Sequence, residues 1–337
     1  MDLELSIVIV NWNTREPLQN CLYSIYNKPS GVNFEVIVVD NASSDDSLEM
    51  VEKKFTSVKI VKNEENLGFA KANNQAIKKA KGKYILLLNP DTIILNSALD
   101  KMVEFMEQHL DAGAVGCKLL DVNGVAQRSW CGFPTLFKEF SHVAMLDNLL
   151  DRERVKGLGR ILSKISRRNF ARYIDQSAAV EVDTVIGACL MVRREVIDRI
   201  GLLDEKFFMY IEEGDWCYRM KKQGWKVYFF PGASIVHLGG ESTKQVIDKM
   251  LLSRYKSLFH FFRKHYGILY FYVLKYIILV GVVLRMSIFF LGSKIGHKQR
   301  SLEKVTIAPI NFNGVMEREK LWKLYKEVIN LVTHYSE

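Results

Sequence analysis

The chain has 337 residues, which fits either two domains or a single large α/β domain with additions, so length leaves the domain count open. It carries 47 Lys and Arg against 38 Asp and Glu, a formal net charge of +9, which suits an anionic partner such as a nucleotide or a lipid headgroup. The five cysteines are scattered and include no C-x-x-C pair, so they indicate neither a zinc ribbon nor a disulfide scaffold and favour a reducing cytoplasm.

Residues 5 to 89 alternate short β-branched runs with amphipathic helical patterns, which is typical of repeated strand–helix–strand units. The predicted strands are 5–10, 35–39, 58–61 and 84–88. Because these runs are continuously apolar, we place them in a parallel sheet covered on both faces. Ligands of such sheets bind beyond the carboxyl ends of the strands. Polar or turn residues follow every predicted strand, at 11–13, 40–43, 66–68 and 89–91.

Three helix starts are predicted from capping residues. Thr14 precedes a helical pattern with Pro17 in its first turn, and Ser44 precedes an acidic first turn. Asp215 is expected to cap a third helix, which ends near Gly224.

The middle of the chain continues the pattern less regularly. We predict a helix over 96–110, a hairpin-like turn at 122–124 and a basic insertion over 141–180. The α/β pattern resumes at 182–192, followed by a helix that ends near Gly201.

The strand at 84–88 ends in Asn89, Pro90 and Asp91. An unpaired carboxylate beyond a core strand is costly to bury, and a bound divalent cation would compensate its charge. Asn89 could add an amide oxygen or bond a ribose hydroxyl. The alternative is a turn in which Asp91 caps the next helix or the local backbone. His237 ends another strand before two glycines, and its ring suits Mn²⁺ or Mg²⁺.

Other strand-end residues have two interpretations each. Asp40 could accept hydrogen bonds from a base or ribose, or form an Asx-turn. Gly68 would let the backbone approach a ligand closely. The pair 73–74 is Asn-Asn, which is unfavourable inside a helix, so it indicates function or a solvated helix face. Trp12 could stack on a base or lie in the core.

Three acids follow the apolar run 207–211, namely Glu212, Glu213 and Asp215. Neighbouring acids allow one to act as a general base while another orients a substrate hydroxyl. The alternative is that all three complement the positive end of a helix.

The C-terminal part contains an apolar stretch over 268–292. Lys275 and Arg285 leave only nine uncharged residues between them, well short of the roughly 20 that a spanning helix needs. We therefore expect a helix in the membrane interface whose basic side chains snorkel, with a soluble helix packed on the catalytic domain as the alternative. A second amphipathic helix is predicted over 321–331.

Seven motifs between residues 4 and 243 together resemble the rhamnosyltransferase-like branch of the family 2 glycosyltransferases. They are "SIVIVNWN", "VIVVDNASSDDS", "NLGFAKANNQAI", "LLLNPDT", "GACLMVRREV", "FFMYIEEGDWCYRMKKQGW" and "VHLGGES". The resemblance implies a GT-A fold: a Rossmann-like, mostly parallel α/β sheet flanked by helices. It also implies a nucleoside-diphosphate-sugar donor, a divalent cation (Mn²⁺ or Mg²⁺) and inversion at the anomeric carbon.

The resemblance also assigns roles to individual residues. Asn89 and Asp91 occupy the family's Asp-x-Asp position, with Asp91 as the metal-binding acid and His237 as a further metal ligand. Glu213 falls at the position of the catalytic base and Glu212 beside it would contact acceptor hydroxyls. Glu213 is one methylene longer than the usual Asp, which leaves open which of the two is the base. The predicted donor-binding residues are Asn11, Trp12, Asp40, Asn41, Gly68, Asn73, Asn89 and Asp91.

The predicted organisation is a glycosyltransferase domain over 1–243, with a nucleotide-binding half (1–95) and an acceptor half (181–243), and a helical extension over 244–337. The family branch favours a dTDP or UDP sugar, with rhamnose as the candidate sugar, and a lipid-linked glycan acceptor of the bacterial envelope. We expect a cytoplasmic enzyme on the inner leaflet, with no nucleic-acid partner. The alternatives are a sugar-nucleotidyltransferase, which normally has a Gly-rich basic loop that "VNWNTREP" lacks, and a non-catalytic polysaccharide- or membrane-binding module.

Overall fold

The computed structural model describes residues 3–27, 30–143, 178–239, 246–294, 302–307 and 312–336. The chain divides into two compact units: a sheet unit (1–133 and 170–246) and a helical unit (134–169 and 247–337). Most of the basic insertion expected at 141–180 lies outside the described residues.

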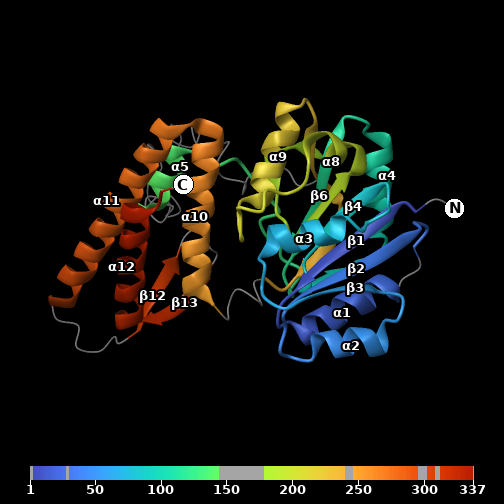
Figure 1. Ribbon diagram of the computed structural model, residues 1–337, viewed down its shortest axis with the longest axis horizontal. Helices are drawn as coiled ribbons and strands as arrows, with labels where there is room; N and C mark the ends of the chain where they lie inside the picture. Colours follow the sequence, from blue (N-terminus) through green and yellow to red (C-terminus); the bar gives the residue numbers. More distant parts are fainter. Residues whose placement is uncertain are drawn as a thin grey trace. The chain divides into compact units, whose positions relative to one another are not determined.

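The sheet unit is built on a nine-stranded mixed sheet (Figure 1). Its strand order is β3-β2-β1-β4-β10-β6-β11-β5, and β8 also pairs with β11. The strands are β1 (Leu5–Asn11), β2 (Phe34–Asn41), β3 (Lys59–Asn63), β4 (Tyr84–Leu88), β5 (Thr92–Ile94), β6 (Ala112–Leu120), β8 (Val180–Glu181), β10 (Cys189–Arg193) and β11 (Lys226–His237). The first four predicted strands are confirmed, and they are parallel as expected. β10 runs antiparallel to both of its neighbours, β4 and β6.

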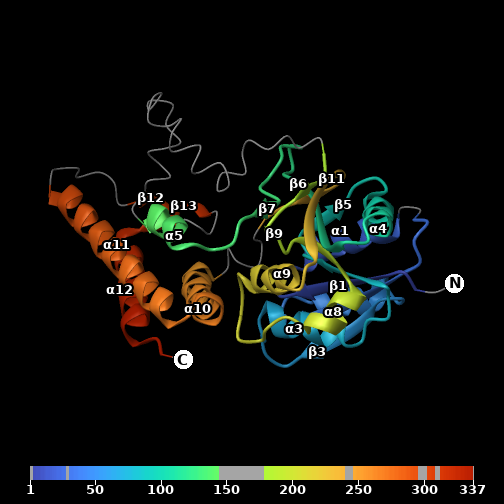
Figure 2. The ribbon, with the colours of Figure 1, turned by 90° about the horizontal axis from the view of Figure 1, so that it is seen from above.

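Helices cover both faces of this sheet, as the continuously apolar strands require. They are α1 (Arg15–Tyr26), α2 (Ser47–Lys54), α3 (Phe69–Ile77), α4 (Ala98–Gln108), α8 (Arg194–Ile200) and α9 (Glu212–Lys222). One core cluster joins α1, α2 and α4 to alternate residues of β1, among them Leu5, Ile7 and Ile9. The helices α3, α8 and α9 lie on the other side of the sheet (Figure 2). Beside the main sheet, β7 (Trp130–Cys131) pairs with β9 (Thr184–Val185).

Two predicted helix starts can be compared with this structure. The first is confirmed, since α1 follows Thr14 directly. The second was placed too early: α2 begins at Ser47, and the Asp45 carboxylate accepts a hydrogen bond from its backbone N–H at 3.2 Å. The turn at 122–124 is confirmed by Gly124, whose φ of 77° and bond to the Asp121 carbonyl close it.

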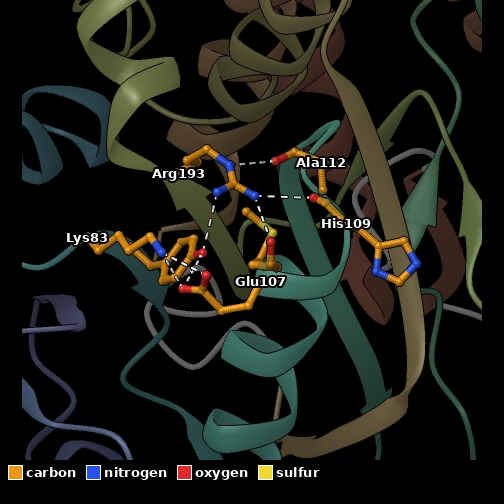
Figure 3. A network of polar contacts seen from close by, with 7 residues as sticks. Lys83, Glu107, His109, Ala112 and Arg193 are labelled. Atoms are coloured by element: carbon orange, nitrogen blue, oxygen red, sulfur yellow. Dashed lines mark hydrogen bonds and ion pairs between the residues drawn. The ribbon is translucent and has the colours of Figure 1, made fainter.

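Arg193, the last residue of β10, ties the end of α4 to the sheet (Figure 3). Its guanidinium donates hydrogen bonds to the carbonyl oxygens of Met106, His109 and Ala112 at 2.7, 3.2 and 3.1 Å. A cation is favourable at this end of a helix, where unpaired carbonyls concentrate negative charge. The Tyr84 hydroxyl in turn donates to Glu107 of α4.

The helical unit contains α5 (Leu136–Val143), α10 (Ile247–Tyr266), α11 (Ile268–Lys294) and α12 (Arg318–His334). Both C-terminal helices predicted from the sequence, at 268–292 and 321–331, are confirmed as α11 and α12. A hairpin of β12 (Leu302–Ile307) and β13 (Phe312–Glu317) was not predicted. Gly267, with a φ of 88°, separates α10 from α11.

Candidate functional site

The carboxyl ends of β1 and β2 are joined by a buried polar network. The Asn11 side chain donates hydrogen bonds to Asp40 Oδ1 at 3.1 Å and to Ser43 Oγ at 3.0 Å. Asp40 Oδ2 accepts a hydrogen bond from the Ser43 backbone N–H at 3.1 Å. This bond forms the Asx-turn that was the alternative interpretation of Asp40. Trp12 is only partly buried, so it is not a core residue. These residues therefore lie together at one edge of the sheet, and their contacts with a donor remain a prediction.

Asn41 organises the connection that follows β3. It donates to the Gly68 carbonyl at 3.1 Å and accepts from Asn63 at 2.9 Å. Gly68 has a φ of 80°, and a Cβ at this position would lie 2.3 Å from the Phe208 carbonyl oxygen. The close approach that we predicted at Gly68 is therefore made by the protein's own backbone, while a contact with the donor stays a prediction.

The pair Asn73 and Asn74 is buried, so the solvated helix face that we considered for it is wrong. Asn73 donates to the Phe69 carbonyl within its own helix at 2.8 Å. Asn74 donates to the Leu203 carbonyl at 2.8 Å and accepts the Leu203 N–H at 3.1 Å. Asn74 therefore fastens α3 to the segment that leads into α9.

Asp91 and His237 come together, as predicted, although no hydrogen bond joins their side chains. His237 is paired with Thr92 across β11 and β5, which places it beside Asp91. Its Nε2 lies 3.5 Å from Asp91 Oδ1, and the two side chains are only 13% and 6% exposed. Because α4 begins at Ala98 after Ser97, Asp91 is not the capping residue of that helix.

Gln127 fixes the proton on the His237 ring. Its amide nitrogen donates to the His237 carbonyl at 2.8 Å, so its amide oxygen must be the atom that faces His237 Nδ1 at 3.1 Å. An amide oxygen only accepts, which places the ring hydrogen on Nδ1. Burial also lowers the pKa of His237, although Asp91 opposes that shift, and the ring is neutral at pH 7. Gln127 could not be predicted from the sequence, because a single glutamine in "VAQRSW" carries no pattern.

This arrangement fits a divalent cation. The buried Nε2 of His237 has no hydrogen-bond partner, and its lone pair faces a carboxylate oxygen. Imidazole and carboxylate are ligands that suit Mn²⁺, and a second group that orients the histidine is usual at metal sites. Among the described residues, no group of three or more His, Cys, Asp or Glu side chains is placed to hold a metal ion. A cation here would take its other ligands from substrate and water.

The acids Glu212 and Glu213 open α9 directly after a strained turn. Tyr210 and Ile211 both have positive φ values, 69° and 71°, which is unusual for bulky and β-branched residues and is often found at functional sites. The helix begins at Glu212, so the predicted capping role of Asp215 is wrong. Asp215 instead lies in the first turn and forms an ion pair with Arg219 at 2.8 Å.

Burial raises the pKa of both Glu212 and Glu213, and for Glu212 the neighbouring Glu213 charge raises it further. Backbone N–H groups around Glu213, including that of Gly187, offset part of its shift. Each side chain has one buried oxygen without a hydrogen-bond partner. Glu212 is buried, with 5% of its surface exposed, whereas Glu213 remains partly exposed.

The two acidic segments meet at the same stretch of backbone. The Asn89 N–H donates to the Ala188 carbonyl at 3.0 Å. The adjacent Gly187 lies against Glu213, whose carboxyl carbon is 3.9 Å from the position that a Cβ of Gly187 would take. The segments "NPD" and "IEEGD" therefore flank one short strip of backbone before β10.

Comparison with known proteins matches residues 6–201 to the family model described as Glycosyl transferase family 2. An N-acetylglucosaminyl-diphospho-decaprenol L-rhamnosyltransferase of Mycobacterium tuberculosis is 24% identical over 242 residues, which is 67% of this chain and 73% of that protein. A low-salt glycan biosynthesis hexosyltransferase of Haloferax volcanii is 26% identical over 225 residues, or 65% of this chain and 62% of that one.

A solved structure shares the fold. The mannosyltransferase PcManGT of Pyrobaculum calidifontis, in complex with GDP-Man and Mn²⁺, has a TM-score of 0.54 and 13% identity, and the match covers 99% of this chain and 86% of that one. The expected mostly parallel sheet flanked by helices is confirmed.

Proposed function

The chain belongs to glycosyl transferase family 2 and is therefore a glycosyltransferase, and we propose that it transfers a sugar from a nucleoside diphosphate to an acceptor hydroxyl with inversion. The observation that supports this proposal is that the segments carrying Asp91 and Glu213 approach one strip of backbone, where Asn89 bonds to Ala188 and Gly187 lies against Glu213. Departure of the diphosphate and removal of the acceptor proton occur on opposite sides of one sugar ring, so we assign the two segments to one substrate.

Glu213 is the proposed base. As the acceptor oxygen bonds to the anomeric carbon, Glu213 takes the hydroxyl proton and the bond from that carbon to the diphosphate breaks. We prefer Glu213 to Glu212 because Glu213 is more exposed to an incoming acceptor than the buried Glu212. A raised pKa makes Glu213 a stronger base than an ordinary glutamate, which favours proton transfer from a hydroxyl.

Asp91 and His237 would hold the divalent cation. A bound Mn²⁺ or Mg²⁺ supplies positive charge that stabilises the departing diphosphate. Gln127 keeps the Nε2 lone pair of His237 directed at Asp91, and the short turn between β4 and β5 holds Asp91 in place. The donor's base and ribose are assigned to the Asn11–Asp40 network and Trp12 at the neighbouring strand ends.

The proposed donor is a dTDP or UDP sugar, and the proposed acceptor is a lipid-linked glycan. Support comes from the Mycobacterium relative, whose name describes rhamnosyl transfer to a decaprenol-linked sugar. We further propose that the enzyme works on the inner leaflet of the cytoplasmic membrane. All five cysteines are free thiols, which suits a reducing compartment.

The test compares Glu213→Gln with Glu212→Gln against a panel of nucleotide sugars and Mn²⁺. We expect Glu213→Gln to abolish release of nucleoside diphosphate but to keep donor binding by calorimetry, and Glu212→Gln to retain more activity. Wild-type turnover in Glu213→Gln would refute the assignment of the base. Release of pyrophosphate would instead indicate a nucleotidyltransferase, and donor binding without any turnover would indicate a binding module.

A further inference from the structure

The helix α11 exposes a long apolar face. Within 268–287, the part of α11 whose side chains the structure describes, no exposed residue is charged. The large exposed residues are Ile268, Leu269, Tyr270, Tyr272, Val273, Tyr276, Val280, Val283 and Leu284. They follow helical spacing, so they form one continuous stripe. From Leu269 to Leu284 the stripe is about 22 Å long at the α-helical rise.

Both basic residues of this stretch lie away from the stripe. Lys275 donates a hydrogen bond to the Tyr335 carbonyl at 3.0 Å. Arg285 donates to the Val143 carbonyl at 3.0 Å and also to the His142 carbonyl. The snorkelling that we expected of these two side chains is therefore wrong: they bond to backbone of the helical unit instead. Consequently they place no charge on the exposed face.

The opposite face of α11 is packed inside the helical unit. Phe271, Leu274, Ile278 and Val282 are buried there, and Phe271 contacts Phe259 of α10 edge-on with ring centroids 5.9 Å apart. Even so, only 28% of the apolar stretch Ile268–Ser287 is buried, far less than in a core helix of a soluble protein. A helix with one face fixed in protein and the other apolar and exposed is suited to lie in an interface.

We propose that this stripe inserts into the headgroup and upper acyl region of a lipid bilayer. The interface with a protein partner normally ends in a polar, charged rim, whereas no exposed residue along this stripe is charged. Its polarity also changes along the axis: tyrosines occupy positions 270, 272 and 276, and only valine and leucine occupy 280, 283 and 284. Tyrosine concentrates at the headgroup level and aliphatic residues lie deeper, so this order matches an obliquely inserted helix. The chain's net charge of +9 favours an anionic surface.

This inference names the surface for the membrane location proposed above, and vesicle binding can be measured without donor or acceptor. Absence of vesicle binding would not contradict the proposed transfer reaction, and absence of transferase activity would not contradict the proposed membrane surface. The full-length chain is mixed with sucrose-loaded vesicles of phosphatidylcholine and phosphatidylglycerol, and the bound fraction is measured by sedimentation. We expect binding that the double variant Leu269→Glu and Leu284→Glu weakens at least tenfold.

The matched control is Leu110→Glu in the sheet unit, because Leu110 is 72% exposed and Leu269 is 71% exposed. The control should bind vesicles like the wild type, and circular dichroism should show all variants folded. The proposal is overturned if the wild type ignores vesicles or if the double variant binds them unchanged. It is also overturned if light scattering shows a dimer that the double variant abolishes while vesicles remain unbound, since a second copy would then cover the stripe.

Discussion

Replacing Gln127 by leucine should weaken the proposed binding of Mn²⁺, while Asp91 and His237 themselves are unchanged. The leucine keeps roughly the same volume but loses both hydrogen bonds to His237, at 2.8 and 3.1 Å. The backbone N–H of residue 127 still donates to the Leu119 carbonyl, so the segment should keep its place. The hydrogen on the His237 ring is then free to move from Nδ1 to Nε2. There it would face Asp91 and occupy the Nε2 lone pair that a metal ion needs.

The expected loss can be worked from these contacts. Two neutral hydrogen bonds contribute about 1 to 3 kcal/mol together. Removing a group that orients a metal-binding histidine typically costs about 10- to 100-fold in affinity, or about 1.4 to 2.7 kcal/mol. The two ranges overlap, so we expect the Kd for Mn²⁺ to rise between tenfold and a hundredfold.

Free Mn²⁺ is measured by electron paramagnetic resonance during a titration in the presence of UDP or dTDP. The matched control is Gln75→Leu, which also removes two side-chain hydrogen bonds, in this case those with Asn63. An unchanged Mn²⁺ affinity in folded Gln127→Leu would refute the role of Gln127. An equal loss of affinity in Gln75→Leu would show that general destabilisation explains the effect.

Three further outcomes are expected. The acid limb of kcat/KM should lie above pH 4.5, because Glu213 must be deprotonated to act and its pKa is raised; a limb at or below 4.5 would contradict its role. Gly68→Ala should lower the free energy of unfolding by more than about 2 kcal/mol in a urea titration, since it meets both the positive φ and the Phe208 carbonyl, whereas Gly124→Ala, with similar φ and open space, should cost about 1 kcal/mol. Arg193→Leu should cost about 3 kcal/mol by the same titration, because three carbonyl oxygens lose their donor; a loss under 1 kcal/mol would contradict this network.

The first four strands of the sheet were predictable because each can be recognised from its own residues. Continuous apolar runs such as 84–88 identify buried parallel strands without knowledge of their partners. The direction of β10 was not predictable in this way, because an apolar run has the same composition in either direction. The starts of α2 and α9 were predicted at the wrong residues. Asp46 and Ile211, which precede these helices, adopt the left-handed conformation, and this was not predictable from their residue types.

Some residues of the candidate site could be predicted from the sequence and others could not. Asp91 and His237 stand at strand ends, where topology itself suggests a ligand. Gln127 stands in an irregular segment, and its partner is 110 residues away, so its role exists only in three dimensions. Asn74 was misread because its low helix propensity suggested solvent, while its actual partner, Leu203, is equally remote in sequence.

The backbone strip at Gly187 and Ala188 makes the spacing between the segments that hold Asn89 and Glu213 depend on strand alignment. Cys189 pairs with Leu88, so each residue by which β10 slid along β4 would carry Gly187 about 3.3 Å relative to Asn89. The proposed base and the proposed metal ligands would then no longer face one sugar ring. Substitutions in the buried parts of β4 or β10, far from any substrate, are therefore expected to lower activity by shifting the pairing of these two strands.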